Sequence, residues 1–367
     1  MGKSGKNWGH KIFYVLIVVA FAIIIVRFSD IRDLYYNIKG GNGYFILAAL
    51  FFQLIYFYFF ASAYSAAFHA VGINTSIRRL YPLIFAYIFV NVVAPTWGIS
   101  GPALLATEAS RRKQSSMKTL AAVLLANIAQ FVTFMLVLIF GFFYMFVNQK
   151  LHTYQVLAGL LLLGLIGLLV LVVFMGLLKQ KLLISIMKWF YRRFNSISKF
   201  FKSGDKFLES NAAADVVEFS TSARRVFGHP KILRKTFMFA LLAHLVNLIS
   251  LSLIFFAFHQ NFTVGILVSG YVMAVLFQII GITPYGIGLS EGAMTLVLAS
   301  FGVPTEKALL ITLVFRGISF WIPFFTGFIL LRKIHLFGLN ELSIRELLLK
   351  NKYITTFKKA VVDLLER

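Results

Sequence analysis

The chain has 367 residues, of which 59% are hydrophobic and only 13% charged, and it carries a formal net charge of +23. A soluble domain cannot hide that much apolar surface, so the composition excludes a soluble globular protein. The basic residues lie between and beyond the apolar runs, a pattern typical of cytoplasmic loops that face anionic lipid, and we expect no nucleic-acid partner.

Apolar runs of membrane-spanning length recur along the chain. A bilayer core needs about 20 apolar residues per helix and leaves no backbone polar group unsatisfied, so these runs predict helices, and no alternating barrel-type strands are seen. The first run, 12–26, follows three lysines and lacks a small-residue cleavage site, which favours an uncleaved span over a signal peptide. The further predicted spans are 44–70, 80–94, 120–147, 154–178, 236–258, 264–280 and 309–331.

Two stretches, 95–109 and 281–301, fit none of these spans. Each is too interrupted by proline and glycine for a regular helix, yet too apolar for an ordinary loop. Irregular backbone at membrane depth is tolerated only where it is buried in protein or lines a water-filled cavity. The sequence therefore predicts an all-α, polytopic transmembrane bundle with two re-entrant or broken helices.

The distribution of lysine and arginine predicts the topology. With a cytoplasmic N-terminus, the positive-inside rule is satisfied only if both broken segments count as reversals. The prediction is a transmembrane unit over 1–335, which includes a basic amphipathic cytoplasmic connection at 179–231, followed by a basic amphipathic cytoplasmic tail at 336–367. We expect a multi-pass protein of the plasma membrane with both termini in the cytoplasm and basic surfaces on an anionic leaflet.

The order of a span, a broken segment and a long span occurs twice, at 80–147 and, in the opposite orientation, at 264–331. Inverted repeats with broken helices are a transporter architecture, and the substrate site lies where the broken segments meet. The two stretches share little sequence beyond a proline and a nearby glycine in each broken segment, so chance similarity is the alternative.

The second broken segment carries a glycine cluster. Gly286, Gly288 and Gly292 follow Pro284 and precede an apolar, helix-like run. Glycines let the backbone bend and let a ligand approach closely, and a helix N-terminus offers N–H donors to an anionic headgroup. The alternative is a turn that only packs two helices closely.

Two charged residues lie in apolar surroundings in this half of the chain. Glu291 falls within the glycine cluster, and Arg316 is the only charged residue of the span 309–331. Ionisable groups at membrane depth are costly, so a functional role is the default hypothesis, and a structural ion pair is the alternative. Arg316 could bind a lipid phosphate or neutralise Glu291, and the sequence leaves both open.

The first broken segment supplies weaker candidates. Pro95 and Gly98 correspond to the proline and glycine of the second segment, and Glu108 is the first-half analogue that we consider for Glu291. A basic cluster follows Glu108 directly, so this carboxylate could instead lie at the membrane interface.

Two polar pairs lie on single helices at a spacing that shares a face. They are His244 with Asn247 and Asn127 with Gln130. In membrane helices such pairs are more often interhelical hydrogen-bonding groups than ligand sites, which is what we predict here.

Catalytic templates are missing from the sequence. There is no H-E-x-x-H, G-x-S-x-G or Walker A motif, and with no cysteine there are no disulfides, cysteine-ligated metals or thiol nucleophiles. We therefore expect no enzyme activity, no cofactor and no metal.

Two motifs carry a resemblance to a known family. The stretch 91–98 (NVVAPTWG) before a basic cluster, the stretch 284–292 (PYGIGLSEG) and the order of the spans resemble the lysylphosphatidylglycerol synthase transmembrane region family, also called flippase-like or UPF0104 membrane proteins. The resemblance covers about 12–332. At the first broken segment the chain departs from the family's Gly-Gly-acid-Arg pattern.

The resemblance implies a lipid flippase. In two-domain relatives a soluble domain transfers lysine to phosphatidylglycerol, and we do not expect that activity here because only about 35 residues follow the last predicted span. The expected partners are membrane lipids, namely a phospholipid, a glycolipid or a polyprenyl-linked substrate, and homo-oligomerisation is left open. The alternatives are a membrane-embedded headgroup or glycosyl transferase with Glu291 as base, and a non-catalytic partner of a synthase.

Overall fold

The computed structural model describes residues 40–93, 100–111, 114–186, 188–189 and 211–336. Within these residues every regular element is helical, which confirms the predicted all-α class. The predicted first span at 12–26 and the tail beyond residue 336 lie outside the described residues, as do Pro95 and Gly98.

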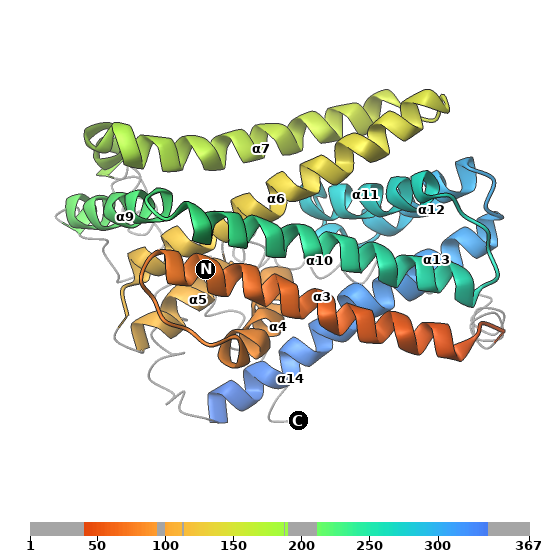
Figure 1. The fold of residues 1–367 in the computed structure, drawn as a ribbon, viewed down its shortest axis with the longest axis horizontal. Coiled ribbons are helices and arrows are strands. Elements are labelled where there is room, and N and C mark those ends of the chain that lie inside the picture. The colour runs from red at the N-terminus through yellow and green to blue at the C-terminus, as the bar shows by residue number, and fades with distance from the viewer. Residues whose placement is uncertain (1–39, 94–99, 112–113, 187, 190–210, 337–367) are drawn as a thin grey trace, which may run out of the picture.

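The described helices form one elongated bundle (Figure 1). In chain order they are α3 (Gly43–Ala70), α4 (Ile77–Val93), α5 (Ser100–Arg111), α6 (Ser116–Val147), α7 (Thr153–Leu178), α9 (Asn211–Phe227), α10 (Pro230–Ala257), α11 (Val264–Ile280), the 3₁₀ turn η1 (Pro284–Gly286), α12 (Leu289–Ser300), α13 (Thr305–Arg316), the π-helical turn η2 (Gly317–Trp321) and α14 (Ile322–Leu336). Five stretches of the described chain are long and apolar enough to cross a membrane: Gly43–Ala70, Ser116–Val147, Thr153–Leu178, Pro230–Ala257 and Thr305–Leu331.

Side-chain caps explain why several helices begin before the apolar runs do. The predicted span at 120 begins as a helix at Ser116, because the Ser115 hydroxyl accepts a hydrogen bond from the Lys118 amide at 3.2 Å. Asn42 caps α3 in the same way through the Tyr44 amide at 3.0 Å. Helix α6 therefore extends beyond its apolar run with a polar first turn.

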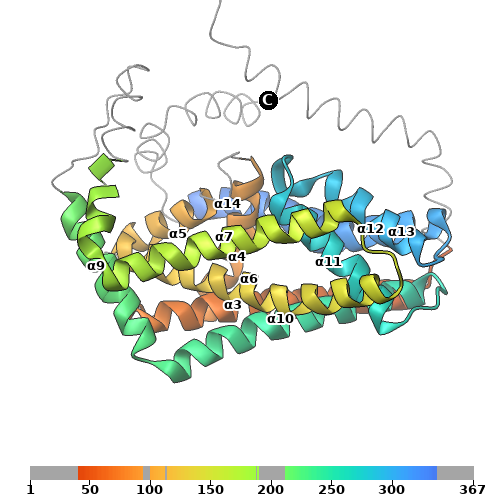
Figure 2. The same cartoon turned by 90° about the horizontal axis from the view of Figure 1, so that it is seen from above.

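Helices α3 and α10 lie side by side and antiparallel along their length in both views (Figures 1 and 2). The Asn42 amide at the start of α3 donates to the Ala257 carbonyl at the end of α10, at 2.9 Å. Within the pair, the Ser250 hydroxyl donates to the Ala49 carbonyl at 2.9 Å. This pair is the central seam of the bundle.

The lengths of the helices repeat on either side of this seam. Helices α3 and α10 have 28 residues each, α4 and α11 have 17 each, and α5 and α12 have 12 each. The continuous helical run 305–336 has the same length as the 32-residue α6. Corresponding helices begin 187 to 189 positions apart, from Gly43 and Pro230 to Ser116 and Thr305.

The packing follows the same repeat. Helix α4 packs on α14, and its counterpart α11 packs on α6, the counterpart of the run that ends in α14. Backbone hydrogen bonds also match, since Ile73 N–H donates to the Phe68 carbonyl just as Gln260 N–H donates to the Phe255 carbonyl. The two sets of helices are thus equivalent. They are inverted relative to each other, because their first helices, α3 and α10, run antiparallel. The repeat predicted at 80–147 and 264–331 therefore begins one helix earlier in each half, with α3 and with α10.

The basic connection between α7 and α10 contributes a helix to the bundle end. Helix α9 packs against α6 and α7, and it buries Val216 and Val226. Within the predicted amphipathic connection at 179–231, residues 187 and 190–210 lie outside the described residues.

A glycine substitution tests the close approach of α14 to α4. A Cβ atom on Gly327 would clash with the Phe85 carbonyl oxygen, whereas a Cβ atom on Gly164 of α7 has open space around it. Gly327→Ala should lower the unfolding temperature of the purified protein in detergent. Gly164→Ala should leave it unchanged or raise it slightly, because alanine favours helix over glycine by about 0.5–1 kcal/mol. Equal melting temperatures for the two variants would contradict this packing.

Candidate functional site

The break between α11 and α12 is a backbone arrangement that needs glycine. Tyr285 and Gly286 both have positive φ angles, 55° and 67°. A Cβ atom on Gly286 would clash with the Phe277 carbonyl and lie 2.5 Å from Gln278 Cα, so only glycine allows this segment to fold back on the end of α11.

Gly288 is the N-cap residue of α12, with φ of 86°. Gly292, by contrast, lies on the exposed side of α12 with open space around it, so it makes no close packing contact. Of the three predicted glycines, two are therefore required by the backbone of the break.

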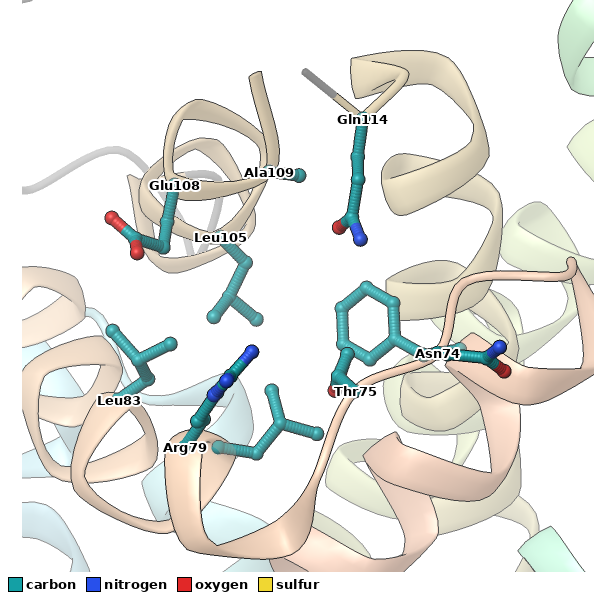
Figure 3. Close-up of a pocket in the computed structure, with 10 residues that line it drawn as sticks. Asn74, Thr75, Arg79, Leu83, Leu105, Glu108, Ala109 and Gln114 are labelled. Atoms are coloured by element: carbon teal, nitrogen blue, oxygen red, sulfur yellow. The ribbon is translucent and has the colours of Figure 1, made fainter. Parts of the chain in front are cut away.

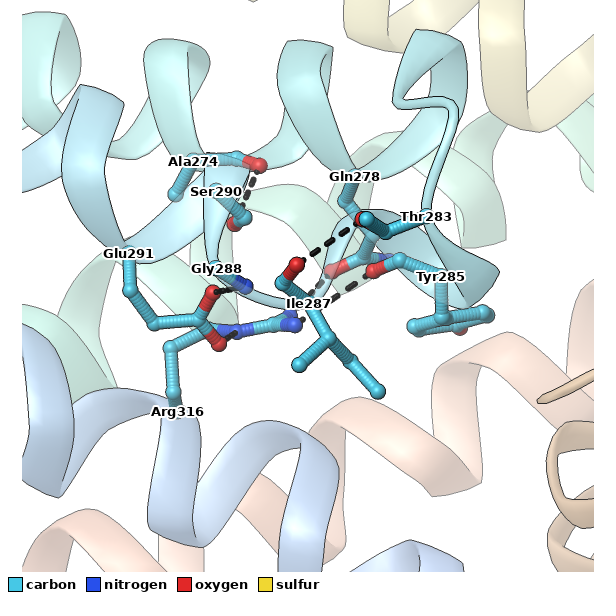
Figure 4. Close-up of polar contacts among 9 residues, drawn as sticks. All are labelled: Ala274, Gln278, Thr283, Tyr285, Ile287, Gly288, Ser290, Glu291 and Arg316. Carbon is cyan, nitrogen blue, oxygen red and sulfur yellow. Dashed lines mark hydrogen bonds and ion pairs between the residues drawn. The ribbon is translucent and has the colours of Figure 1, made fainter. Parts of the chain in front are cut away.

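Glu291 holds the start of α12. Its Oε2 accepts a hydrogen bond from the Gly288 amide at 2.7 Å, which satisfies one of the N–H groups left open by the break (Figure 4). The Thr283 hydroxyl donates to the Ile287 carbonyl at 2.8 Å, and this bond ties the two ends of the turn together. The negative charge lies in the first turn, where the helix dipole favours it.

Arg316 reaches the same break from α13 and joins three structural elements. Its Nε donates to Glu291 Oε1 at 2.7 Å, and its Nη1 donates to Gln278 Oε1 at 2.6 Å (Figure 4). A longer contact of 3.4 Å links Nη2 to the Tyr285 carbonyl. The guanidinium also lies 4.6 Å from the centre of the Phe320 ring. The structure thus joins the two predicted charges in one ion pair.

The two partners of the ion pair differ in accessibility. The Arg316 side chain is 2% exposed, whereas the Glu291 side chain is 14% exposed. Gly288 and Leu289 beside the carboxylate are exposed as well. A ligand can therefore reach the site from the side of Glu291 and the N-terminus of α12, and it meets Arg316 only by displacing a present partner.

A π-helical turn, η2, follows Arg316 directly. Such turns insert an extra residue into a helix and often lie at functional sites. Here the turn carries Phe320, whose ring stacks on Tyr285 at 5.2 Å and packs beside the guanidinium. The turn therefore helps to hold Arg316 against the break.

Gln278 and the Tyr285 carbonyl were not among the residues predicted from the sequence. Gln278 is the only amide residue in α11, and its isolation in an apolar helix is a signal that could have indicated it. A backbone carbonyl carries no such signal, because its position depends on the fold of the break.

The equivalent positions of the first half hold uncharged residues. Given the repeat, Asn127 occupies the place of Arg316, Asn91 that of Gln278, and Pro102 that of Glu291. Asn127 Oδ1 accepts from the Tyr64 hydroxyl at 2.6 Å, and Asn91 Oδ1 accepts from the Gly101 amide at 2.7 Å. The charged constellation is therefore present in one half only.

Glu108 lies elsewhere, because Pro102 and not Glu108 stands at the position of Glu291. It lines a separate half-open pocket, which it shares with Arg79 and Gln114 (Figure 3). The predicted first-half candidates Pro95 and Gly98 fall outside the described residues.

The predicted interhelical role of the polar pairs is confirmed for His244 and Asn127. His244 Nδ1 hydrogen-bonds with the Tyr271 hydroxyl at 2.7 Å, and its Nε2 hydrogen-bonds with the Gln130 carbonyl at 3.1 Å. These bonds join α10 to α11 and α6. Within the described residues, no group of three or more His, Asp or Glu side chains is placed to hold a metal ion.

Comparison with known proteins identifies the family. Residues 12–327 match the model of the lysylphosphatidylglycerol synthase TM region. The chain belongs to this family. It is therefore a multi-pass integral membrane protein, in agreement with its long apolar helices.

Several relatives of this TM region carry the name UPF0104 membrane protein. One from Pyrococcus horikoshii is 22% identical over 331 residues, which cover 88% of this chain and 97% of the relative. A second, from Methanothermobacter thermautotrophicus, is 23% identical over 325 residues, or 85% of this chain and 92% of the relative. A third, from Methanocaldococcus jannaschii, is 22% identical over 333 residues, or 86% of this chain and 93% of the relative.

A double-mutant cycle tests the ion pair. Glu291→Gln leaves the buried Arg316 charge without its partner, so it should lower the free energy of unfolding by roughly 3–5 kcal/mol. Arg316→Gln should lower it by less, because Glu291 is partly exposed. The double variant removes both charges and should lose clearly less than the sum of the two single losses. Denaturant unfolding of the protein in detergent measures all four free energies. Additive losses would mean that the two side chains do not stabilise each other.

Proposed function

We propose that this protein moves a lipid or lipid-linked substrate between the membrane leaflets, and that the headgroup is bound at the break between α11 and α12. The observation that carries the proposal is the Arg316–Glu291 ion pair, which lies at a broken helix and is accessible only on its Glu291 side. Ionisable groups at membrane depth are costly and rare, and they mark substrate and ion pathways. The family and the names of the relatives are consistent with a lipid-related membrane role.

The site offers two kinds of recognition. A phosphate can compete with Glu291 for the Arg316 guanidinium, which binds planar anionic groups through two parallel hydrogen bonds. The freed Glu291 can then accept a hydrogen bond from a hydroxyl or ammonium group of the same headgroup. In this account Arg316 and Glu291 neutralise each other when no ligand is bound. When a headgroup binds, its phosphate pairs with Arg316 and its hydroxyl or ammonium group contacts Glu291.

Competition between the phosphate and Glu291 for Arg316 suits transport better than tight binding of the headgroup would. A ligand shifts a conformational equilibrium only by its difference in affinity for the two states. A phosphate that breaks the Arg316–Glu291 bond also releases the Gly288 amide contact at the start of α12. Binding would thereby loosen the break itself, which is the element that must move if the headgroup is to pass.

A membrane-embedded transferase with Glu291 as general base is the rival function. Both carboxylate oxygens of Glu291 accept hydrogen bonds, from Gly288 and from Arg316. A substrate hydroxyl could donate its proton to Glu291 only after one of these two donors had been displaced. The geometry therefore supports transport over transfer, and the same purified protein can be assayed for both.

The proposed orientation follows the basic residues. The end of the bundle at which α3, α7 and α9 end and α4, α6 and α10 begin carries Arg78, Arg79, Lys118, Arg224, Arg225 and Lys231. We propose that this end faces the cytoplasm in the plasma membrane, because lysine and arginine are enriched on that side.

Leaflet exchange tests the function. Proteoliposomes with fluorescent anionic, zwitterionic or polyprenyl-phosphate lipids should show exchange of at least one class by the unaltered protein. Glu291→Gln and Arg316→Gln should each reduce that rate by tenfold or more, because one interaction with a charged group contributes about 1.5–3 kcal/mol.

Glu306→Gln is the matched control for this assay. Glu306 is an exposed acid in the first turn of α13, so its replacement changes the net charge equally without touching the break. Its exchange rate should equal that of the unaltered protein. Product formation from a lipid donor, or no exchange of any lipid by folded protein, would contradict the proposal.

A further inference from the structure

A second polar site lies at the basic end of the bundle, in the pocket lined by Arg79 and Glu108 (Figure 3). The connection between α3 and α4 forms one wall, α5 forms another, and the beginning of α4 forms the floor. The larger apolar side chains that line the pocket are Phe68, Leu80, Leu83 and Leu105.

Arg79, Gln114 and Thr75 are the polar side chains of this pocket that could contact a ligand. The exposed Arg79 guanidinium and the side-chain amide of Gln114 make no hydrogen bond or ion pair with other described residues. Both point into the space between them, whereas the Glu108 carboxylate points away from it (Figure 3). The hydroxyl of Thr75 is shielded from solvent and has no hydrogen-bond partner. Buried polar groups are normally satisfied, so this hydroxyl indicates a missing ligand or water.

The second half of the repeat contains the same backbone arrangement, so the pocket can be compared with the equivalent place there. Gln114 N–H donates to the Ala109 carbonyl at 2.9 Å, and the equivalent Val303 N–H donates to the Leu298 carbonyl at 3.2 Å. The connection from α3 to α4 matches that from α10 to α11 in its hydrogen bonds, as described above. The backbone of the pocket is therefore present twice.

The two halves differ in the side chains that they place on this backbone. In the second half the position of Ala109 is taken by Leu298, which is fully buried and packs on Gly270. The positions of Thr75 and Arg79 are taken there by Phe262 and Ile266, which pack against the core. The fold thus does not require a pocket here, and in the second half apolar side chains fill the equivalent place.

We propose that this pocket binds the phosphate of an anionic lipid headgroup, as a site separate from the Arg316 break. Arg79 supplies the charge-assisted hydrogen bonds to the phosphate, and Thr75 and Gln114 supply neutral ones. The apolar side chains that line the pocket favour an amphiphile over a free phosphate ion. The site lies at the basic end of the bundle, where an anionic leaflet would bring its headgroups to the mouth of the pocket.

Binding of a short-chain lipid tests the site without any transport. Isothermal titration of the full chain in detergent with dihexanoyl phosphatidylglycerol, below its micelle concentration, should give saturable binding. Arg79→Gln should weaken the affinity about tenfold or more, the loss of one charge-assisted contact. Arg78→Gln is the matched control, because Arg78 is an exposed neighbour in the same helical turn that does not line the pocket. Its affinity should stay within about twofold.

A filled pocket provides the second test. The double variant Thr75→Phe and Ala109→Leu copies the second half without changing charge. It should abolish the binding that Arg79→Gln weakens, while its melting temperature stays close to that of the unaltered protein. The variant Glu291→Gln with Arg316→Gln should bind the lipid normally, which separates this site from the one proposed for transport.

Four outcomes would overturn the proposal. The first is equal losses in the Arg78 and Arg79 variants, which would indicate general electrostatics. The second is normal binding by the filled variant. The third is binding of inorganic phosphate as tight as that of the lipid, which would assign the pocket to a free anion. An absence of binding by folded protein would overturn it as well.

Discussion

The Arg316–Glu291 ion pair is the interaction on which the centre of this structure depends. A guanidinium that is 2% exposed must be neutralised and hydrogen-bonded, because an unpaired charge in an apolar bundle is strongly destabilising. Glu291 neutralises it and at the same time satisfies the Gly288 amide that the broken helix leaves open. The break, the short helix α12 and the last helical run are therefore fixed by one carboxylate. Because that carboxylate is also the accessible partner, a ligand that engages it acts on all three elements.

The repeated architecture separates what the scaffold needs from what the chemistry needs. Both halves use helices of matching length and the same reciprocal packing, yet the arginine of each site occurs in one half only. At the break, the second half has Arg316 where the first half has Asn127, held by the Tyr64 hydroxyl. At the basic end, the first half has Arg79 where the second half has Ile266. The two equivalent halves thus provide two different sites. A single substrate could contact both sites, one after the other.

Much of the fold could be predicted from the sequence because apolar run length is a strong signal in membranes. The runs at 44–70 and 264–280 match α3 and α11 to within a residue. The helix at Ser116 begins earlier than its apolar run, since a hydroxyl cap and a polar first turn carry no hydropathy signal. Glu291 and Arg316 stand out as isolated charges. Gln278 stands out far less, and the Tyr285 carbonyl not at all, because both depend on how the break folds.

The relation between the halves was harder to predict at the level of residues. Glu108 was considered as the analogue of Glu291 because it is the acid of the first broken segment, but the helix boundaries place Pro102 at that position. Apolar helices tolerate many side chains at one position, so sequence identity between the halves is lost while lengths and packing persist. Only the helix boundaries and hydrogen bonds reveal which residues are equivalent.

The central claim is that the ion pair handles substrate and is not merely a structural link. The most direct measurement is the lipid exchange rate of the double variant Glu291→Gln with Arg316→Gln, after its unfolding free energy has been compared with that of the unaltered protein. The account predicts a folded protein that has lost exchange, because both recognition groups are gone while no charge is left unpaired. Normal exchange by the folded double variant would contradict it and would reduce the pair to a structural role.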